Sequence, residues 1–64
     1  MEEFIVGKKY YDSARRQDIR DARNVLAQAK KHRGNSEYHA DLMRVVRLHI
    51  DGVRYANKKL DAYV

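Results

Sequence analysis

The sequence contains no cysteine and no proline, and it has only three glycines. Without cysteine, neither a disulfide bond nor a thiolate zinc site can hold the chain together. A 64-residue chain is one domain at most, and a core of that size is marginal. Self-association is therefore the most direct way for this chain to complete its core.

Metal ligands are also scarce, because the three histidines are scattered. His39 and His49 fall on one helix face, but ten residues of helix separate them by nearly three turns. We therefore expect both imidazoles to be satisfied by hydrogen bonds, and we expect no metal site and no cofactor.

The chain has neither a long apolar run nor a catalytic motif. No stretch approaches the ~20 apolar residues that cross a bilayer. The acidic start MEEFIVG is unlike a secretory signal, so we expect a cytoplasmic protein with no membrane partner. A glycine-rich phosphate loop, an HExxH helix and a nucleophile beside a base are all lacking, which predicts that the protein is not an enzyme.

What the chain does have is positive charge: 14 Lys and Arg against 9 Asp and Glu, a formal net charge of +5. This balance favours an anionic partner. The alternative is that the lysines and arginines are solvated residues that support helix propensity and solubility.

One segment, KKHRGNSE, has the composition of a helix end followed by a helix start. The basic residues suit the negative end of a helix dipole, and Gly34 is expected to adopt the left-handed conformation that ends many helices. Asn35 or Ser36 then caps a second helix. The connection is predicted to be a short turn at residues 34–35.

The sequence thus predicts an all-α fold, with helices at about 8–33 and 36–63. A connection this short makes two helices antiparallel neighbours, so the domain is expected to be a helical hairpin. Residues 1–7 are expected to form an arm or frayed turn that packs Phe4 and Ile5.

The second helix carries a heptad seam, in which apolar or small residues recur at spacings of four and three. Val45, Leu48 and Tyr55 lie beside this seam, and one partner helix cannot cover so wide a surface. A dimer of hairpins forming a four-helix bundle, or a higher helical oligomer, is therefore favoured. Alternatively, the extra residues are ordinary exposed apolar side chains. The predicted oligomer interface comprises Leu42, Val45, Val46, Leu48, His49, Gly52, Val53, Tyr55, Ala56 and Leu60.

The first helix has a narrower seam, which Arg15 interrupts. In antiparallel register Arg15 comes near the level of residues 51–54, with Asp18 one turn further along. We expect Arg15 to pair with a carboxylate, and an anion-binding pocket is the alternative. The seam residues are Tyr11, Ile19, Ala22, Leu26 and Ala29.

Basic residues form a stripe on the outer side of each helix, several of them at intervals of seven. The stripe on the first helix runs for about 30 Å at 1.5 Å per residue. Regular spacing along a rod suits successive phosphates of a nucleic acid, although a solvated charged face remains the alternative. The predicted anion-binding residues are Lys9, Arg16, Arg20, Arg23, Lys30, Lys31, Arg44, Arg47, Arg54 and Lys58.

In length and plan the chain is similar to RNA-binding hairpins of the Rop type, in which two helical hairpins dimerise and one helix face contacts RNA. No residue motif of that group is matched, so the resemblance implies an architecture and no site residues. Two other functions stay open. One is a protein-binding adaptor or inhibitor, of the size that mobile elements often encode. The other is a binder of a small phosphorylated ligand at the open end of the hairpin, beside Tyr10.

Overall fold

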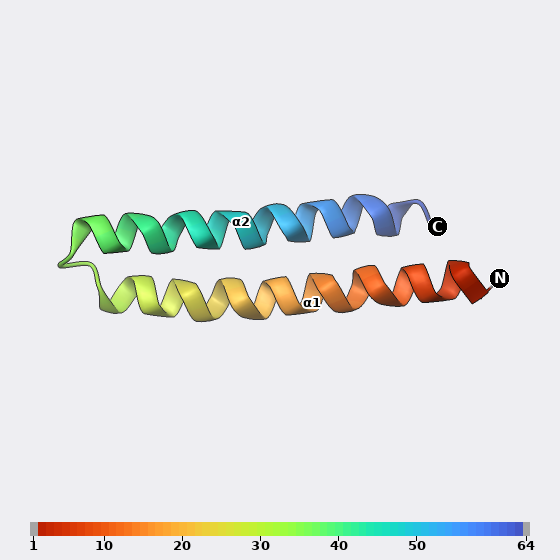
Figure 1. Ribbon diagram of the computed structural model, residues 1–64, viewed down its shortest axis with the longest axis horizontal. Coiled ribbons are helices and arrows are strands. Elements are labelled where there is room, and N and C mark those ends of the chain that lie inside the picture. Colours follow the sequence, from red (N-terminus) through yellow and green to blue (C-terminus); the bar gives the residue numbers. More distant parts are fainter. Residues whose placement is uncertain (1, 64) are drawn as a thin grey trace.

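The protein is an antiparallel hairpin of two long helices, with both chain termini at the same end (Figure 1). The computed structural model describes residues 2–63, and it describes side chains for residues 7–63. Helix α1 spans Glu2–Lys31 and helix α2 spans Ser36–Asp61. Over the described residues the chain is helical apart from the turn and its C-terminal end, which confirms the predicted all-α hairpin.

Helix α1 begins earlier than the sequence pattern predicts. It starts at Glu2 rather than Lys8, and it ends at Lys31 rather than Arg33. The expected arm is therefore helical from Glu2 onward, and the helix runs through Gly7 because an interior glycine costs only about 1 kcal/mol. The expected packing of Phe4 and Ile5 falls outside the described side chains.

The turn between the helices differs in one respect from the prediction. Gly34 has no positive φ, so the expected left-handed residue is wrong. Helix α1 instead ends in tight turns, in which His32 N–H donates to Ala29 O at 3.2 Å and Asn35 N–H donates to His32 O at 3.1 Å. Asn35 is the N-cap of α2, and its side-chain oxygen accepts a hydrogen bond from Tyr38 N–H at 3.1 Å.

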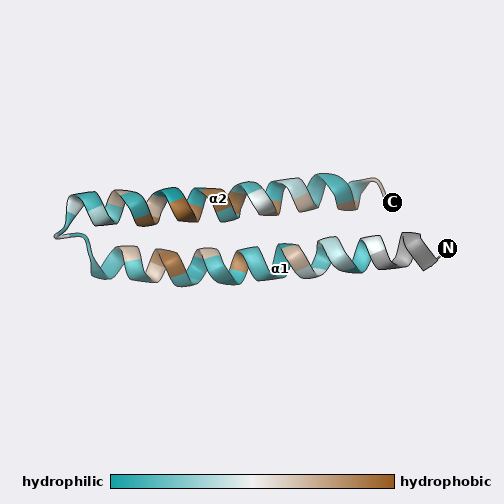
Figure 2. Ribbon diagram, viewed as in Figure 1, coloured by the Kyte–Doolittle hydropathy of each residue, from teal (hydrophilic) through white to brown (hydrophobic). Residues whose placement is uncertain are grey.

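The core between the helices is thin. Within residues 7–63 the buried hydrophobic residues are Ala29, Val46 and Ala56, and no large side chain there is fully buried. The rest of the α2 seam, as predicted, is half-buried against α1: Leu42, His49, Val53, Leu60 and Tyr63. Among the coloured residues, hydrophobic ones are concentrated in the middle of both helices, and the end at the turn is mostly hydrophilic (Figure 2).

A rod of this shape leaves much of its surface in water. The accessible area is 5356 Å², whereas a compact protein of 7.6 kDa exposes about 4,300 Å². The hairpin buries about half of the area of its unfolded chain, compared with ~60% for a typical domain of 60 residues. Hydrophobic burial within one chain is therefore small.

Polar contacts join the helices where apolar ones are missing. Arg15 donates to Asn57 Oδ1 on α2 at 3.0 Å and forms a salt bridge with Asp12 at 2.7 Å. Pairing with a carboxylate was expected, but that carboxylate belongs to α1 itself. Asp18, one turn further along α1, lies against His49 and Gly52, so Arg15 is near the expected level of residues 51–54, and its long side chain reaches Asn57.

A second polar contact joins Asp18 of α1 to His49 of α2. His49 Nδ1 donates to Asp18 Oδ1 at 3.0 Å, and the two side chains are 26% and 29% exposed. A Cβ atom at Gly52 would overlap the Asp18 carboxylate, so glycine is what lets this carboxylate approach α2. His39 Nδ1 donates to Ala29 O at 2.9 Å, and the hydrogen-bonded histidines therefore match the prediction.

Neither helix, over the residues described, has a segment that is both long enough and apolar enough to cross a bilayer.

The cap at Asn35 gives a direct test of the turn. Replacing Asn35 with Ala should lower the free energy of unfolding by about 1 kcal/mol, because Tyr38 N–H loses its acceptor at the start of α2. Urea denaturation followed by circular dichroism measures the change. Ser36→Ala is the matched control and should have a much smaller effect, and an equal loss in both variants would contradict the assignment of Asn35 as the cap.

The space at Gly52 gives a second test. In an Asp18→Ala background, Gly52→Ala should stabilise the protein by about 1 kcal/mol through helix propensity. In the wild type the same substitution should stabilise the protein less, or should destabilise it, because the new methyl group displaces the Asp18 carboxylate from His49. Urea denaturation of the four proteins at one concentration measures this coupling, and equal effects in both backgrounds would refute the close approach.

Candidate nucleic-acid interface

Contacts between the helices identify two opposite sides of the hairpin. The Arg15–Asn57 hydrogen bond lies on one side of the seam. On the other side, the rings of Tyr11 and Tyr55 meet edge to face with centroids 6.3 Å apart. At about 100° per residue, these contacts allow every other position to be assigned to one side or the other. We call the first side the basic face and the second the tyrosine face.

Basic residues of both helices project on the basic face, along its two outer edges. In antiparallel helices, positions rotated in the same sense from the seam reach the same side of the pair. The α1 and α2 stripes both rotate towards the side of Arg15, so two basic rows flank one surface. The members of these rows are Arg16, Arg23 and Lys30 on α1, and Arg47 and Arg54 on α2.

The other predicted anion-binding residues do not share this surface fully. Lys9, Arg20 and Lys58 point almost directly away from the seam, at the outer edges of the hairpin. Lys31 and Arg44 are rotated further, towards the tyrosine face. All ten predicted residues are exposed, but only about half of them can contact one ligand at the same time.

Few carboxylates compete for these cations. Arg16 pairs with Asp12 at 3.2 Å, and Arg44 pairs with Asp41 at 3.1 Å. Both arginine side chains are about three-quarters exposed, at 76% and 75%, and pairs of this kind contribute at most about 1 kcal/mol. Within residues 7–63 no ion pair occupies the remaining cations of the two rows, which are Arg23, Lys30, Arg47 and Arg54.

A narrow apolar strip separates the two rows. Ile19 and Ile50 are 36% and 41% exposed, and Leu26 and Met43 beside them are half-buried. The strip offers no hydrogen-bonding groups that could distinguish base edges. The basic face is therefore suited to phosphates rather than to reading a base sequence.

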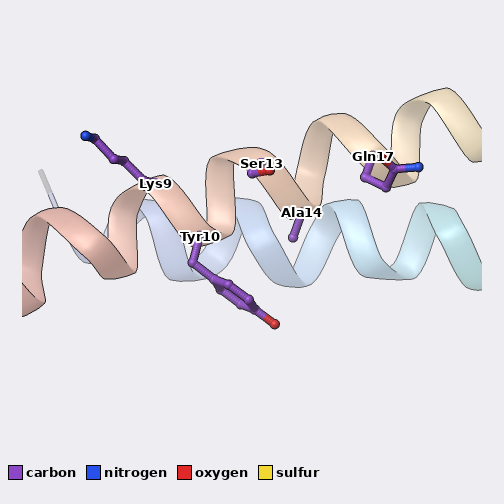
Figure 3. Close-up of a pocket in the computed structure, with 5 residues that line it drawn as sticks. All are labelled: Lys9, Tyr10, Ser13, Ala14 and Gln17. Atoms are coloured by element: carbon purple, nitrogen blue, oxygen red, sulfur yellow. The ribbon is translucent and has the colours of Figure 1, made fainter.

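Two shallow hollows lie on the surface of α1, and each is lined by residues of that helix alone. In the first, Lys9 and Tyr10 point in different directions, so they do not converge on one small ligand (Figure 3). Its other lining residues are Ser13, Ala14 and Gln17. The second hollow is lined by Arg16, Ile19, Arg20, Arg23 and Asn24, and it places three arginines around one apolar side chain.

The tyrosine face carries the most exposed of the large hydrophobic side chains that the structure describes. Leu48, Tyr10 and Tyr55 are 68%, 66% and 57% exposed, and Val45 is 38% exposed. Tyr10 meets Tyr11 edge to face at 5.2 Å, and Lys59 Nζ lies 5.4 Å from the centre of the Tyr55 ring. The tyrosines at the open end thus pack mainly on one another.

The residues of the predicted oligomer interface fall into an exposed group and a group that is buried or half-buried within the hairpin. Val45, Leu48 and Tyr55 are free to meet another chain. The remaining members are buried or half-buried in the single hairpin: Leu42, Val46, His49, Gly52, Val53, Ala56 and Leu60.

The fold and surface define a small helical hairpin with one basic face and one aromatic and aliphatic face. Searches against protein-family models, curated proteins and solved structures find no match to this chain. The function of this chain is therefore inferred from its own residues.

Proposed function

We propose that this chain is a non-enzymatic helical hairpin that self-associates through its tyrosine face and binds nucleic acid through its basic face. The observation that carries the proposal is the pair of basic rows on one side of the hairpin, in which most of the cations have no carboxylate partner.

The spacing within each row supports phosphate contacts. Arg16, Arg23 and Lys30 follow one another at intervals of seven residues, as do Arg47 and Arg54. Seven residues of helix span about 10.5 Å, which is about three phosphates along one strand of a duplex. A straight rod 51 Å long can therefore present several regularly spaced cations to the phosphates of a nucleic acid.

The apolar strip between the rows sets the kind of contact. It would face sugars and groove edges, which tolerate apolar neighbours, while the arginines meet phosphate oxygens. Binding of this kind depends on shape and charge, so affinity should fall steeply as salt is added.

Exposed area supports self-association. The hairpin exposes about 1,000 Å² more than a compact protein of its mass, and a standard interface removes about 800 Å² from each partner. The tyrosine face is the better surface for a second copy, because its apolar side chains are the more exposed and its edges carry fewer arginines. A dimer built in this way leaves both basic faces open to solvent.

Nucleic-acid binding can be tested by the salt dependence of affinity. Replacing Arg23 and Arg47 with Gln removes one cation from each row and should lower the slope of log K against log salt by about two. Fluorescence anisotropy with duplex and single-stranded oligonucleotides measures it. The control changes Lys31 and Arg33 to Gln, which lowers the net charge equally outside the basic face and should leave the slope nearly unchanged.

A stronger variant combines Arg16→Glu, Arg20→Glu and Arg23→Glu, and it should abolish binding while the helical circular dichroism signal stays the same. Absence of affinity in the wild type even at low salt would overturn the proposal. Equal losses in the control and in the Arg23 and Arg47 variant would show that net charge, and not the basic face, attracts the ligand.

Self-association can be tested at Leu48. Sedimentation at tens of micromolar should give a dimer for the wild type and a monomer for Leu48→Glu, because a carboxylate cannot be buried in the interface without a large cost. Ala27→Glu, an exposed position on the outer side of α1, is the control and should remain dimeric. A wild-type monomer at this concentration would refute the dimer.

A second candidate function is a protein-binding adaptor or inhibitor, which the exposed Leu48 and Tyr55 side chains favour. The same experiments separate the two. If the wild type is a monomer without affinity for oligonucleotides, both faces are available to a different protein. If it is a dimer with salt-dependent binding, the second copy of the chain occupies the tyrosine face.

A further inference from the structure

Three potential metal ligands from both helices lie together at the middle of the hairpin. Asp18 and Asp21 are one turn apart on α1, and His49 reaches them from α2. One donor atom from each residue lies within 4.8 Å of the other two, and all three side chains are half-buried. The sequence pattern predicts no metal site, because it offers only distant histidines and does not show which carboxylates the fold brings to His49.

We propose that Asp18, Asp21 and His49 bind a divalent transition-metal ion of the zinc class between α1 and α2. The donor set is one imidazole nitrogen and two carboxylate oxygens, which suits Zn²⁺ and Co²⁺, whereas Mg²⁺ and Ca²⁺ prefer oxygen ligands alone. Helical bundles build such sites from side chains on facing helices.

The distances fit an ion after small side-chain movements. Zinc binds nitrogen and oxygen at about 2.0–2.2 Å, so ligand atoms around one ion lie roughly 3–3.5 Å from each other. Asp18 Oδ1 and His49 Nδ1 are already 3.0 Å apart. Asp21 accepts a hydrogen bond from Gln17 at 3.1 Å in an exposed position, and a rotation of its side chain releases that contact. The ion takes the place of the Nδ1 proton between Asp18 and His49, and the neutral imidazole then carries its single proton on Nε2.

Gly52 is an independent sign that α2 is shaped around this group. The Asp18 carboxylate fills the space that a Cβ atom at Gly52 would need. A glycine inside a long helix is unfavourable for the helix, so its presence here is explained by the room it leaves for the carboxylate. Gly52 also faces the seam between α1 and α2, so a ligand bound beside it lies between the two helices rather than on one of them.

A bound ion would connect the two helices at their midpoint. The hairpin has no disulfide bond, and the buried hydrophobic residues of its described part are small. An ion held by ligands from both helices stabilises the folded chain in proportion to the logarithm of its free concentration. This effect is separate from nucleic-acid binding and does not depend on it.

The test uses the metal salts alone on the full chain after dialysis against a chelator. Zn²⁺ should give a saturable heat of binding by calorimetry and should raise the midpoint of thermal unfolding by about 5–10 °C at ten times its Kd. Co²⁺ should give visible absorption bands of a protein-bound ion. Mg²⁺ at the same concentration should change neither quantity.

Asp21→Asn is the informative variant, because it removes one ligand and leaves the Asp18–His49 hydrogen bond intact. It should weaken Zn²⁺ binding about tenfold or more while the metal-free protein unfolds at nearly the same temperature. His49→Gln should abolish binding, whereas His32→Gln, which removes an exposed imidazole in the turn, should not change it. Absence of Zn²⁺ binding by the wild type, or equal affinity in Asp21→Asn and the wild type, would overturn the proposal.

Discussion

The narrow contact between α1 and α2 is the constraint on which the rest of this molecule depends. Helix α2 has a continuous apolar seam. The residues of α1 that pack against this seam are alanines and polar residues as often as large apolar ones. Arg15 and Asp18 occupy positions on α1 where a stable hairpin would place leucine or isoleucine. As a result, the buried hydrophobic side chains among those the structure describes are Ala29, Val46 and Ala56. Partners outside the single chain become important because so little is buried within it.

The polar contacts that replace a hydrophobic core specify the alignment of the two helices, which apolar contacts would not. Arg15 meets Asn57 at 3.0 Å, and Asp18 meets His49 at 3.0 Å. Sliding one helix by a turn would break both hydrogen bonds and would place a side chain other than Gly52 against the Asp18 carboxylate. These contacts therefore specify the register of the hairpin, and the register in turn sets the level of one basic row relative to the other.

The sequence predicts much of this fold, for identifiable physical reasons. The spacing of Val46, Val53 and Leu60 defines the face of α2 that packs on α1, because a long helix has a regular period. Helix ends are harder to predict. Gly7 does not stop α1, since one glycine costs little in a helix of 30 residues. The basic run before Gly34 suggests a left-handed helix end, yet the turn closes through hydrogen bonds among ordinary conformations.

The surfaces, like the fold, are only partly predictable from the sequence. Each basic stripe is visible in the sequence, but its position relative to the other depends on the level at which the helices pair. For the same reason, the proximity of Asp18 and His49, separated by 31 residues in sequence, has no signature in the pattern. Contacts between distant residues depend on register, and register is set by side chains that are individually unremarkable in sequence.

The turn at Gly34 has a practical consequence. A Cβ atom there would have no neighbour within 4 Å, and the backbone is not left-handed, so any residue type can occupy the position. The chain has no cysteine of its own. A single thiol introduced by Gly34→Cys would be the unique chemical handle on the molecule, at the end of the rod opposite both termini and away from the middle of both faces. A fluorophore or spin label attached at that point would report the orientation of the hairpin in any assembly that it joins.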